Sequence, residues 1–142
     1  MFSKLKRSST LGLLVLTGLV CLATGWGLRT AVGEVTPPTA DKGISRETGP
    51  DVDLGPELPG YRMHMNVVTF APGAIRAIHD HKQNPEAAYV LEGTLTEYRK
   101  GSAPQEFKAG QMRGNGREVE HWIENHGTGK AVQVSVVVVK AK

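Results

Sequence analysis

The stretch that decides the fold is GAIRAIHDHKQNPEAAYVLEG, residues 73 to 93, in which His79 and His81 stand one residue apart. Residues 76 to 81 are expected to form a strand, and Glu92-Gly93 ends the stretch with turn chemistry. In an extended strand the side chains repeat every two residues, so both histidines project from one face and both imidazoles can reach one ion. Helical geometry would splay them apart. The stretch therefore predicts a strand that carries a pair of metal ligands.

A second stretch, GQMRGNGREVEHWIEN at residues 110 to 125, contributes His121, and the first stretch also holds Glu86. Three histidines and one glutamate can together form one divalent-metal site. Neutral imidazole nitrogen and carboxylate oxygen suit first-row transition metals, whereas calcium and magnesium sites are built mostly from oxygen. We therefore expect one divalent transition metal, which could be iron, manganese, zinc, nickel or copper.

The spacing of these residues resembles the paired motifs of the cupin superfamily. The first motif of that family is a glycine, five residues, His-x-His, three or four residues, a glutamate, six residues and a glycine, and residues 73 to 93 meet every position. The second motif is matched by Gly110, His121 and Asn125, but Gly116 stands where proline is usual and Glu118 where glycine is usual. The resemblance covers about residues 61 to 139.

What the resemblance implies is a single-domain cupin, an all-β double-stranded helix or jelly-roll barrel, with metal ligands His79, His81, Glu86 and His121. Residues 89 to 97 and 121 to 125 are also similar to small exported bacterial cupin-domain proteins of unassigned function. The residues alone favour a sandwich or a small barrel, because short β-rich runs alternate with turns and no internal repeat is present. The expected strands are residues 61–71, 76–81, 87–92, 94–100, 105–108, 119–124 and 131–140.

The first 33 residues are typical of an export signal or an N-terminal membrane anchor. A positive start, with Lys4, Lys6 and Arg7, precedes an apolar run at residues 11 to 23, and small-x-small cleavage sites follow it. We favour cleavage, which places the protein in the periplasm or outside the cell. The alternative is anchoring to the inner membrane by an uncleaved segment. Lipidation of Cys21 is disfavoured because no small residue of the usual kind stands just before it.

Charge excludes nucleic acid as an expected partner. The whole chain has 17 basic and 14 acidic residues and a formal charge of +3, but four of the basic residues lie in the first 33. The rest of the chain therefore carries a net charge of −1, which removes the electrostatic support for nucleic-acid binding. Residues 34 to 60 are rich in proline and glycine and lack apolar periodicity, which predicts an extended, partly disordered linker or arm. Residues 61 to 142 then form the barrel domain.

The last run, residues 131 to 140, is apolar on both faces toward its end. Alternation predicts Val132, Val134, Val136 and Val138 in the core, with Gln133 and Ser135 outside. Val137 and Val139 break that pattern, which favours contact with another subunit and hence a homodimer. Cover by the proline-rich arm is the alternative.

Five residues are candidates for binding a small-molecule ligand. The predicted pocket residues are Tyr61, Met63, Arg76, Tyr98 and Trp122. Ordinary core packing is the competing explanation for the apolar and aromatic members, and a solvated charge is the competing explanation for Arg76. His64 and His126 are interpreted as surface or hydrogen-bonded residues.

Two function classes follow from a metal site with open coordination positions. The first is a metal-dependent enzyme, for which the resemblance favours an oxidoreductase of the dioxygenase type, since many single-domain cupins with this ligand set act in that way, over an isomerase or lyase. The second is a non-catalytic exported protein that binds a small ligand or the metal itself. The catalytic residues are not identified by the sequence.

Overall fold

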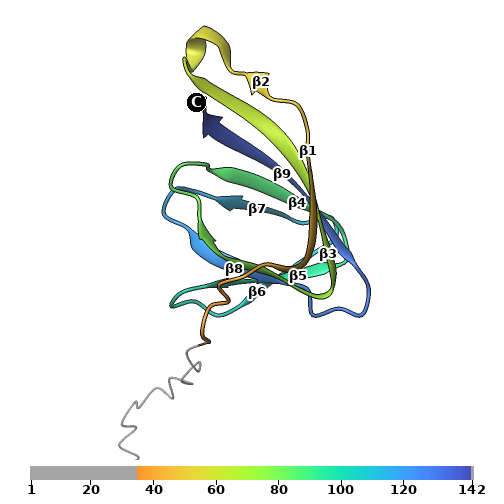
Figure 1. Ribbon diagram of the computed structural model, residues 1–142. Coiled ribbons are helices and arrows are strands. Elements are labelled where there is room, and N and C mark those ends of the chain that lie inside the picture. The colour runs from red at the N-terminus through yellow and green to blue at the C-terminus, as the bar shows by residue number, and fades with distance from the viewer. Residues whose placement is uncertain (1–34, 142) are drawn as a thin grey trace, which may run out of the picture. The chain divides into compact units, whose positions relative to one another are not determined.

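The computed structural model describes residues 35–141 and shows an all-β fold, which confirms the predicted fold class (Figure 1). One antiparallel sheet of nine strands curls into a nearly closed barrel, and seven of its strands follow the order β6-β5-β8-β3-β9-β4-β7. The strands are β1 (Lys42–Thr48), β2 (Val52–Asp53), β3 (Tyr61–Asp80), β4 (Glu86–Glu92), β5 (Thr94–Arg99), β6 (Gln105–Lys108), β7 (Met112–Asn115), β8 (Glu120–Glu124) and β9 (Ala131–Lys140), with one 3-10 turn at Gly55–Glu57.

Strand β3 is continuous over twenty residues, although the sequence predicted a break at Pro72-Gly73. The chain bends there without leaving the sheet, with Gly73 at a φ of 71°. The bend is fixed by Asn125, whose side-chain amide donates to the backbone oxygens of Phe70 and Ala71 at 3.1 and 3.0 Å. The first part of β3 therefore pairs with β9, and its last part pairs with β8, where the histidines lie.

Part of the predicted linker is a strand. Strand β1 pairs antiparallel with β3, with Thr48 opposite Asn66, and only Ile44 of β1 packs against the core. Edge pairing of this kind depends on backbone hydrogen bonds rather than on apolar side chains, so a search for hydrophobic periodicity misses it. The segment between residues 34 and 60 thus contributes to the sheet rather than only connecting to it.

The predicted orientation of β9 was wrong for most of the strand. Gln133 and Ser135 are 3% and 2% exposed and face the interior together with Val137, whereas Val134 and Val136 lie on the outer face. The side chain of Gln133 accepts a hydrogen bond from the buried Arg113, so this part of the barrel interior is polar. The polar interior explains why the predicted orientation was wrong. Apolar alternation is a poor guide where the inner wall carries a polar site.

The hydrophobic core is therefore limited in extent. It comprises Val68, Phe70, Ala74, Val90, Leu95, Phe107, Ile123 and Ala131. Strand β7, which the sequence predicted as part of a turn region, closes the sheet beside β4 and carries Arg113 and Asn115 into the interior. The barrel thus packs its apolar residues in one region and polar side chains in another.

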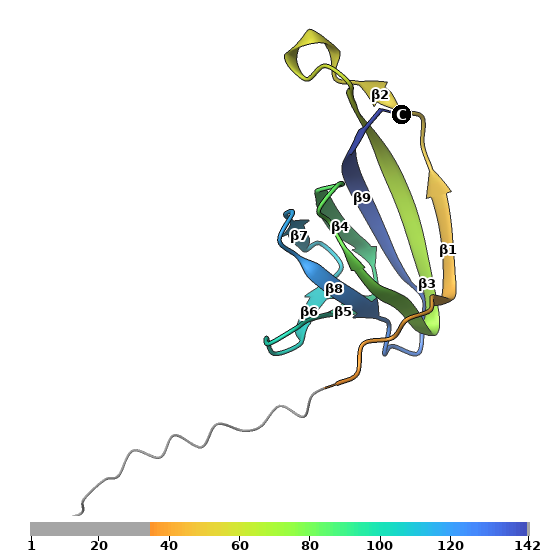
Figure 2. The ribbon, with the colours of Figure 1, turned by 60° about the vertical axis from the view of Figure 1, so that its left-hand side comes forward.

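The outer face of β3, β9, β4 and β7 is apolar and exposed, and these strands lie side by side in Figure 2. Met65, Tyr89 and Met112 are 52%, 40% and 76% exposed, and register places Val136 opposite Met65. No charged residue stands at the outward-facing positions in the middle of these four strands. We refer to this surface as the outer apolar face.

Within residues 35–141, none of the helical structure has the length and hydropathy needed to cross a membrane. The predicted signal peptide or anchor, residues 1 to 33, lies outside the described residues.

Candidate metal centre

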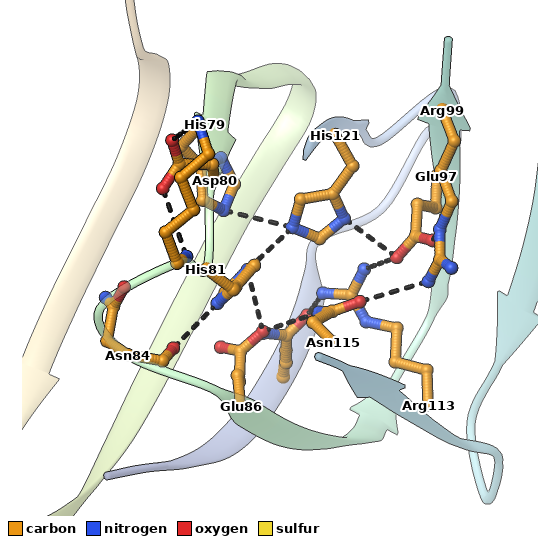
Figure 3. Close-up of polar contacts among 12 residues, drawn as sticks. His79, Asp80, His81, Asn84, Glu86, Glu97, Arg99, Arg113, Asn115 and His121 are labelled. Atoms are coloured by element: carbon orange, nitrogen blue, oxygen red, sulfur yellow. Dashed lines mark hydrogen bonds and ion pairs between the residues drawn. The ribbon is translucent and has the colours of Figure 1, made fainter. Parts of the chain in front are cut away.

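Three histidines converge on one point inside the barrel (Figure 3). His79 lies near the end of β3, His81 follows that strand directly, and His121 lies on β8 opposite His79 in the strand register. The Nε2 atom of His121 is 2.9 Å from that of His81 and 3.1 Å from that of His79. The ligand nitrogens of the three rings all lie within 4.8 Å of one another.

The other nitrogen of each ring fixes the position of its proton. Nδ1 of His79 is 2.8 Å from the carbonyl oxygen of Ala77, and Nδ1 of His81 is 3.0 Å from that of Asn84. A carbonyl oxygen can only accept, so both Nδ1 atoms donate and both Nε2 atoms of the neutral rings keep a free lone pair.

His121 follows the same pattern through a carboxylate. Its Nδ1 is 3.0 Å from Oε2 of Glu97, a short contact whose angle departs from that of a straight hydrogen bond. Because the carboxylate is an acceptor, the proton of His121 also belongs on Nδ1. Three unprotonated Nε2 atoms therefore face one another at close range, which is unfavourable unless a cation lies between them.

The distances fit a shared metal ion. Nitrogens held about 2.0–2.1 Å from one ion are separated from each other by roughly 2.9 to 3.4 Å, depending on the coordination angle. The contacts of 2.9 and 3.1 Å between Nε2 atoms fall in that range. The three histidines thus have the chemistry and the spacing of a metal site.

Burial favours the neutral form of the His79 and His121 rings, which metal binding requires. His121 is fully buried and His81 is 3% exposed. Burial lowers the pKa of His79 from 6.5 to about 4, and it also lowers the pKa of His121 in spite of the nearby Glu97. At neutral pH no proton competes with an ion for Nε2 of either residue.

Glu86, the first residue of β4, lies beside the cluster. Its Oε2 is 3.8 Å from Nε2 of His81 and accepts a hydrogen bond of 2.8 Å from the side-chain amide of Asn115. Burial raises the pKa of Glu86, but the charge of Arg113 and the bond from Asn115 outweigh burial and leave the pKa lowered. The carboxylate is therefore ionised and near the histidines, and its role as a fourth ligand stays a prediction.

A buried ionic network contacts His121 at Nδ1, the ring nitrogen that faces away from the histidine cluster. The sequence did not predict this network. Glu97 on β5 is 2% exposed and forms ion pairs with Arg99 and Arg113, and Arg113 also donates to Gln133. Burial acts to raise the pKa of Glu97, but His121 and the two arginines hold it at about 2. The only sequence signal was that Glu97 stands two residues after the apolar Leu95 and therefore shares its face of the strand.

A cavity of about 190 Å³ adjoins His79 and His81. It is lined by Arg46, His64, Asn66, Val68, Phe70, Arg76, His79, His81, Asn84, Glu86, Ile123, Gln133, Ser135, Val137 and Val139. Arg76 was predicted as a pocket residue, and it lies in the lining. His64, which was interpreted as a surface or hydrogen-bonded residue, is in the lining as well and pairs with Asp51 at 3.1 Å.

The four other predicted pocket residues, Tyr61, Met63, Tyr98 and Trp122, are not part of that lining, so their placement does not support ligand contact. Met63 lies opposite Val138 on the outer side of the sheet. Trp122 alternates with the inward-facing His121 and stacks on Tyr98 with ring centroids 4.9 Å apart. The phenol of Tyr98 is also 2.9 Å from His126, which explains that exposed histidine as a hydrogen-bonded residue.

The fold and the site together define a nearly closed antiparallel β-barrel with a histidine cluster on its inner wall. The family model described as "Cupin domain" matches residues 66–138, and the chain belongs to the cupin family. The resemblance seen in the two sequence motifs is confirmed at the level of the family. No curated protein shows significant similarity to the chain.

Solved structures share the fold. A cupin superfamily protein from Desulfitobacterium hafniense is 11% identical with a TM-score of 0.55, over 72% of this chain and 83% of that chain. The Cnp3 cupin domain of Schizosaccharomyces pombe is 18% identical with a TM-score of 0.52, over 75% and 69%. Oxalate oxidase in complex with the substrate analogue glycolate is 25% identical with a TM-score of 0.52, over 79% of this chain and 60% of that chain. The alignment with another solved structure covers 49% of that protein's chain, so the present chain spans about half of its length.

Proposed function

We propose that the protein binds one divalent transition metal through His79, His81 and His121, with Glu86 as the fourth ligand. The observation that carries this proposal is the convergence of three Nε2 atoms whose Nδ1 partners are all acceptors. Iron, manganese, zinc, nickel and copper all accept imidazole nitrogen with carboxylate oxygen. Four protein ligands leave one or two positions of an octahedral ion open, which is the arrangement of a catalytic rather than a closed structural site.

For the reaction we propose a metal-dependent oxidoreductase of the dioxygenase type that acts on a small molecule. The cavity beside His79 and His81 gives a ligand access to the open side of the proposed site. The similarity to oxalate oxidase, an oxidoreductase, at 25% identity supports the same broad class. A bound iron or manganese ion would supply redox chemistry, and the residues of this chain would bind the substrate and exclude water around it.

The test of this proposal is dioxygen uptake by the natively purified protein loaded with Fe²⁺ or Mn²⁺. The candidate substrates to be tested are small organic acids, phenols and thiols. His121→Ala serves as the control because it removes a proposed ligand at the centre of the cluster. Uptake that requires both the metal and His121 would support the proposal. A loaded protein that consumes no dioxygen with any compound would contradict the reaction class but not the metal site.

The alternative is a non-catalytic protein that binds a small ligand or the metal, and one observation favours it. Glu86 is the only carboxylate that lines the cavity among residues 35–141, and it is held by Asn115 beside His81. If Glu86 ligates the metal, the described lining holds no second carboxylate that could act as a general base. A compound whose binding is detected by calorimetry, but which the protein does not convert, would favour this alternative.

Two further proposals concern where and in what form the protein works. The signal-like residues 1 to 33 support export to the periplasm or beyond. The outer apolar face supports a homodimer, because a second copy can cover Met65, Tyr89 and Met112 without burying a charged side chain.

A further inference from the structure

Two arginines from different parts of the chain face the cavity beside the proposed metal site. Arg76 comes from the far end of β3, and Arg46 comes from β1, the strand formed by the segment predicted as a linker. Strand β1 brings Arg46 there because its register places this residue opposite Val68, another lining residue. Arg46 lies outside residues 66–138, the part of the chain that the cupin family model matches.

The two guanidinium groups are incompletely neutralised. Arg76 pairs with Asp41 at 3.3 Å, whereas the exposed Arg46 makes no ion pair with any of the residues that the structure describes. The pKa of Arg76 is lowered by burial first and by the positive charge of Arg46 second, so the two cations lie close enough to repel each other. An anion placed between them would relieve that repulsion.

Formal charge at the cavity favours an anion as well. The lining holds two arginines and one glutamate, Glu86, which leaves +1 with the histidines neutral. A divalent ion at the histidine cluster raises this charge to +3, and Asp41 outside the lining lowers it to +2. A net positive charge of this size in a partly enclosed site is expected to attract small anions and to disfavour cations.

The size and the walls of the cavity limit the anion to a small one. A volume of about 190 Å³ lies below the roughly 300–1,000 Å³ of pockets that hold drug-sized molecules, so it suits a ligand of only a few non-hydrogen atoms. Asn66, Asn84 and Gln133 offer amide groups, while Phe70 and Val137 offer apolar contact. A short carbon chain with a charged end matches such walls better than a fully hydrated inorganic ion does.

We infer that this cavity binds a small organic carboxylate, with its carboxylate group between Arg46 and Arg76 and its other end toward the histidine cluster. Arginine presents a planar fork of donors that matches the two oxygens of a carboxylate. The inference rests on the proposed metal site and adds the class of ligand that the site takes. It also assigns a ligand-binding role to β1, which supplies half of the arginine pair.

Isothermal titration calorimetry of the Zn²⁺-loaded natural protein with succinate tests the inference. Succinamide is the uncharged analogue, and inorganic phosphate is the competing anion. Succinate is expected to bind at least tenfold more tightly than succinamide. Arg46→Gln and Arg76→Gln should each weaken succinate binding at least tenfold and leave the zinc content unchanged. Arg117→Gln is the matched control, because Arg117 is exposed and lies outside the cavity.

The outcomes separate the two proposals. Equal affinity for succinate and succinamide, or wild-type affinity in Arg46→Gln, would overturn the carboxylate site while the metal site stands. Preference for phosphate over succinate would overturn the carboxylate class. Failure of the wild-type protein to hold zinc would overturn both, and far-UV circular dichroism of each variant identifies any loss of binding that comes from misfolding.

Discussion

Replacing Glu97 with glutamine should destabilise the protein strongly, although the two side chains have nearly the same shape. The side chain of Glu97 is 1% exposed and pairs with Arg113, whose side chain is 2% exposed. Removing one partner of a buried ion pair leaves the other charge uncompensated, which typically costs about 3–5 kcal/mol. The pKa of Glu97 gives a second route to the magnitude. It lies at about 2 instead of 4.5, so the folded protein favours the charged over the neutral form by about 3 kcal/mol.

Both routes therefore predict that Glu97→Gln lowers the free energy of unfolding by about 3 kcal/mol, which corresponds to about 12–24 °C in melting temperature for a domain of this size. Urea unfolding followed by tryptophan fluorescence measures the change, and Glu106→Gln, an exposed carboxylate on the neighbouring β6, is the control. The same variant should bind metal about 10- to 100-fold more weakly, because Glu97 orients His121. A loss of stability below about 0.5 kcal/mol would refute the reasoning, since it would mean that the buried network contributes nothing net.

Three other predictions concern protonation, backbone geometry and assembly. In the metal-free protein the pKa of His79 is lowered from 6.5 to about 4, so the unfolded chain takes up this proton first as the pH falls. The free energy of unfolding should therefore drop by about 1–2 kcal/mol between pH 6.5 and pH 4, and a flat profile from chemical unfolding would contradict this. Gly93→Ala should cost about 2–3 kcal/mol, because Gly93 has a φ of 76° and a Cβ there would lie 2.8 Å from the carbonyl oxygen of Lys130. Gly101→Ala, with a φ of 75° and open space, should cost clearly less in the same thermal melts, and equal losses would count against the steric argument. Light scattering after size exclusion should give a dimer for the wild type and a monomer for Met65→Lys, and a monomeric wild type would exclude the homodimer.

The sequence predicted the pairing of His79 and His81 well because that information is local: the strand period puts both on one face. His121 was predicted through the resemblance to the second cupin motif, and the strand register places it opposite His79. The turn glycines are also local signals, and Gly93 has the positive φ that such a turn requires. The all-β class followed from the same short runs and turns.

The supporting network was not predictable in this way. Glu97 pairs with Arg113, sixteen residues later, and Arg113 with Gln133, twenty residues further on, so these contacts exist only once the barrel has closed. A buried glutamate looks in the sequence like any exposed one. The same polar interior reversed the expected orientation of β9, because Gln133 and Ser135 are needed inside.

Strand β1 escaped prediction for a different reason. It is held by backbone hydrogen bonds at a sheet edge, and six of its seven residues are exposed, so it has no apolar pattern to recognise. Its contribution is visible only in the structure, where Arg46 enters the cavity lining.

The claim on which the rest depends is that His79, His81 and His121 share one metal ion. Elemental analysis of the natively purified protein, set beside His81→Ala, tests it most directly. We expect close to one transition-metal ion per chain in the wild type and loss of most of that metal in His81→Ala. A wild-type protein that carries no metal under conditions that load other metalloproteins, or a His81→Ala variant with undiminished metal content, would contradict it.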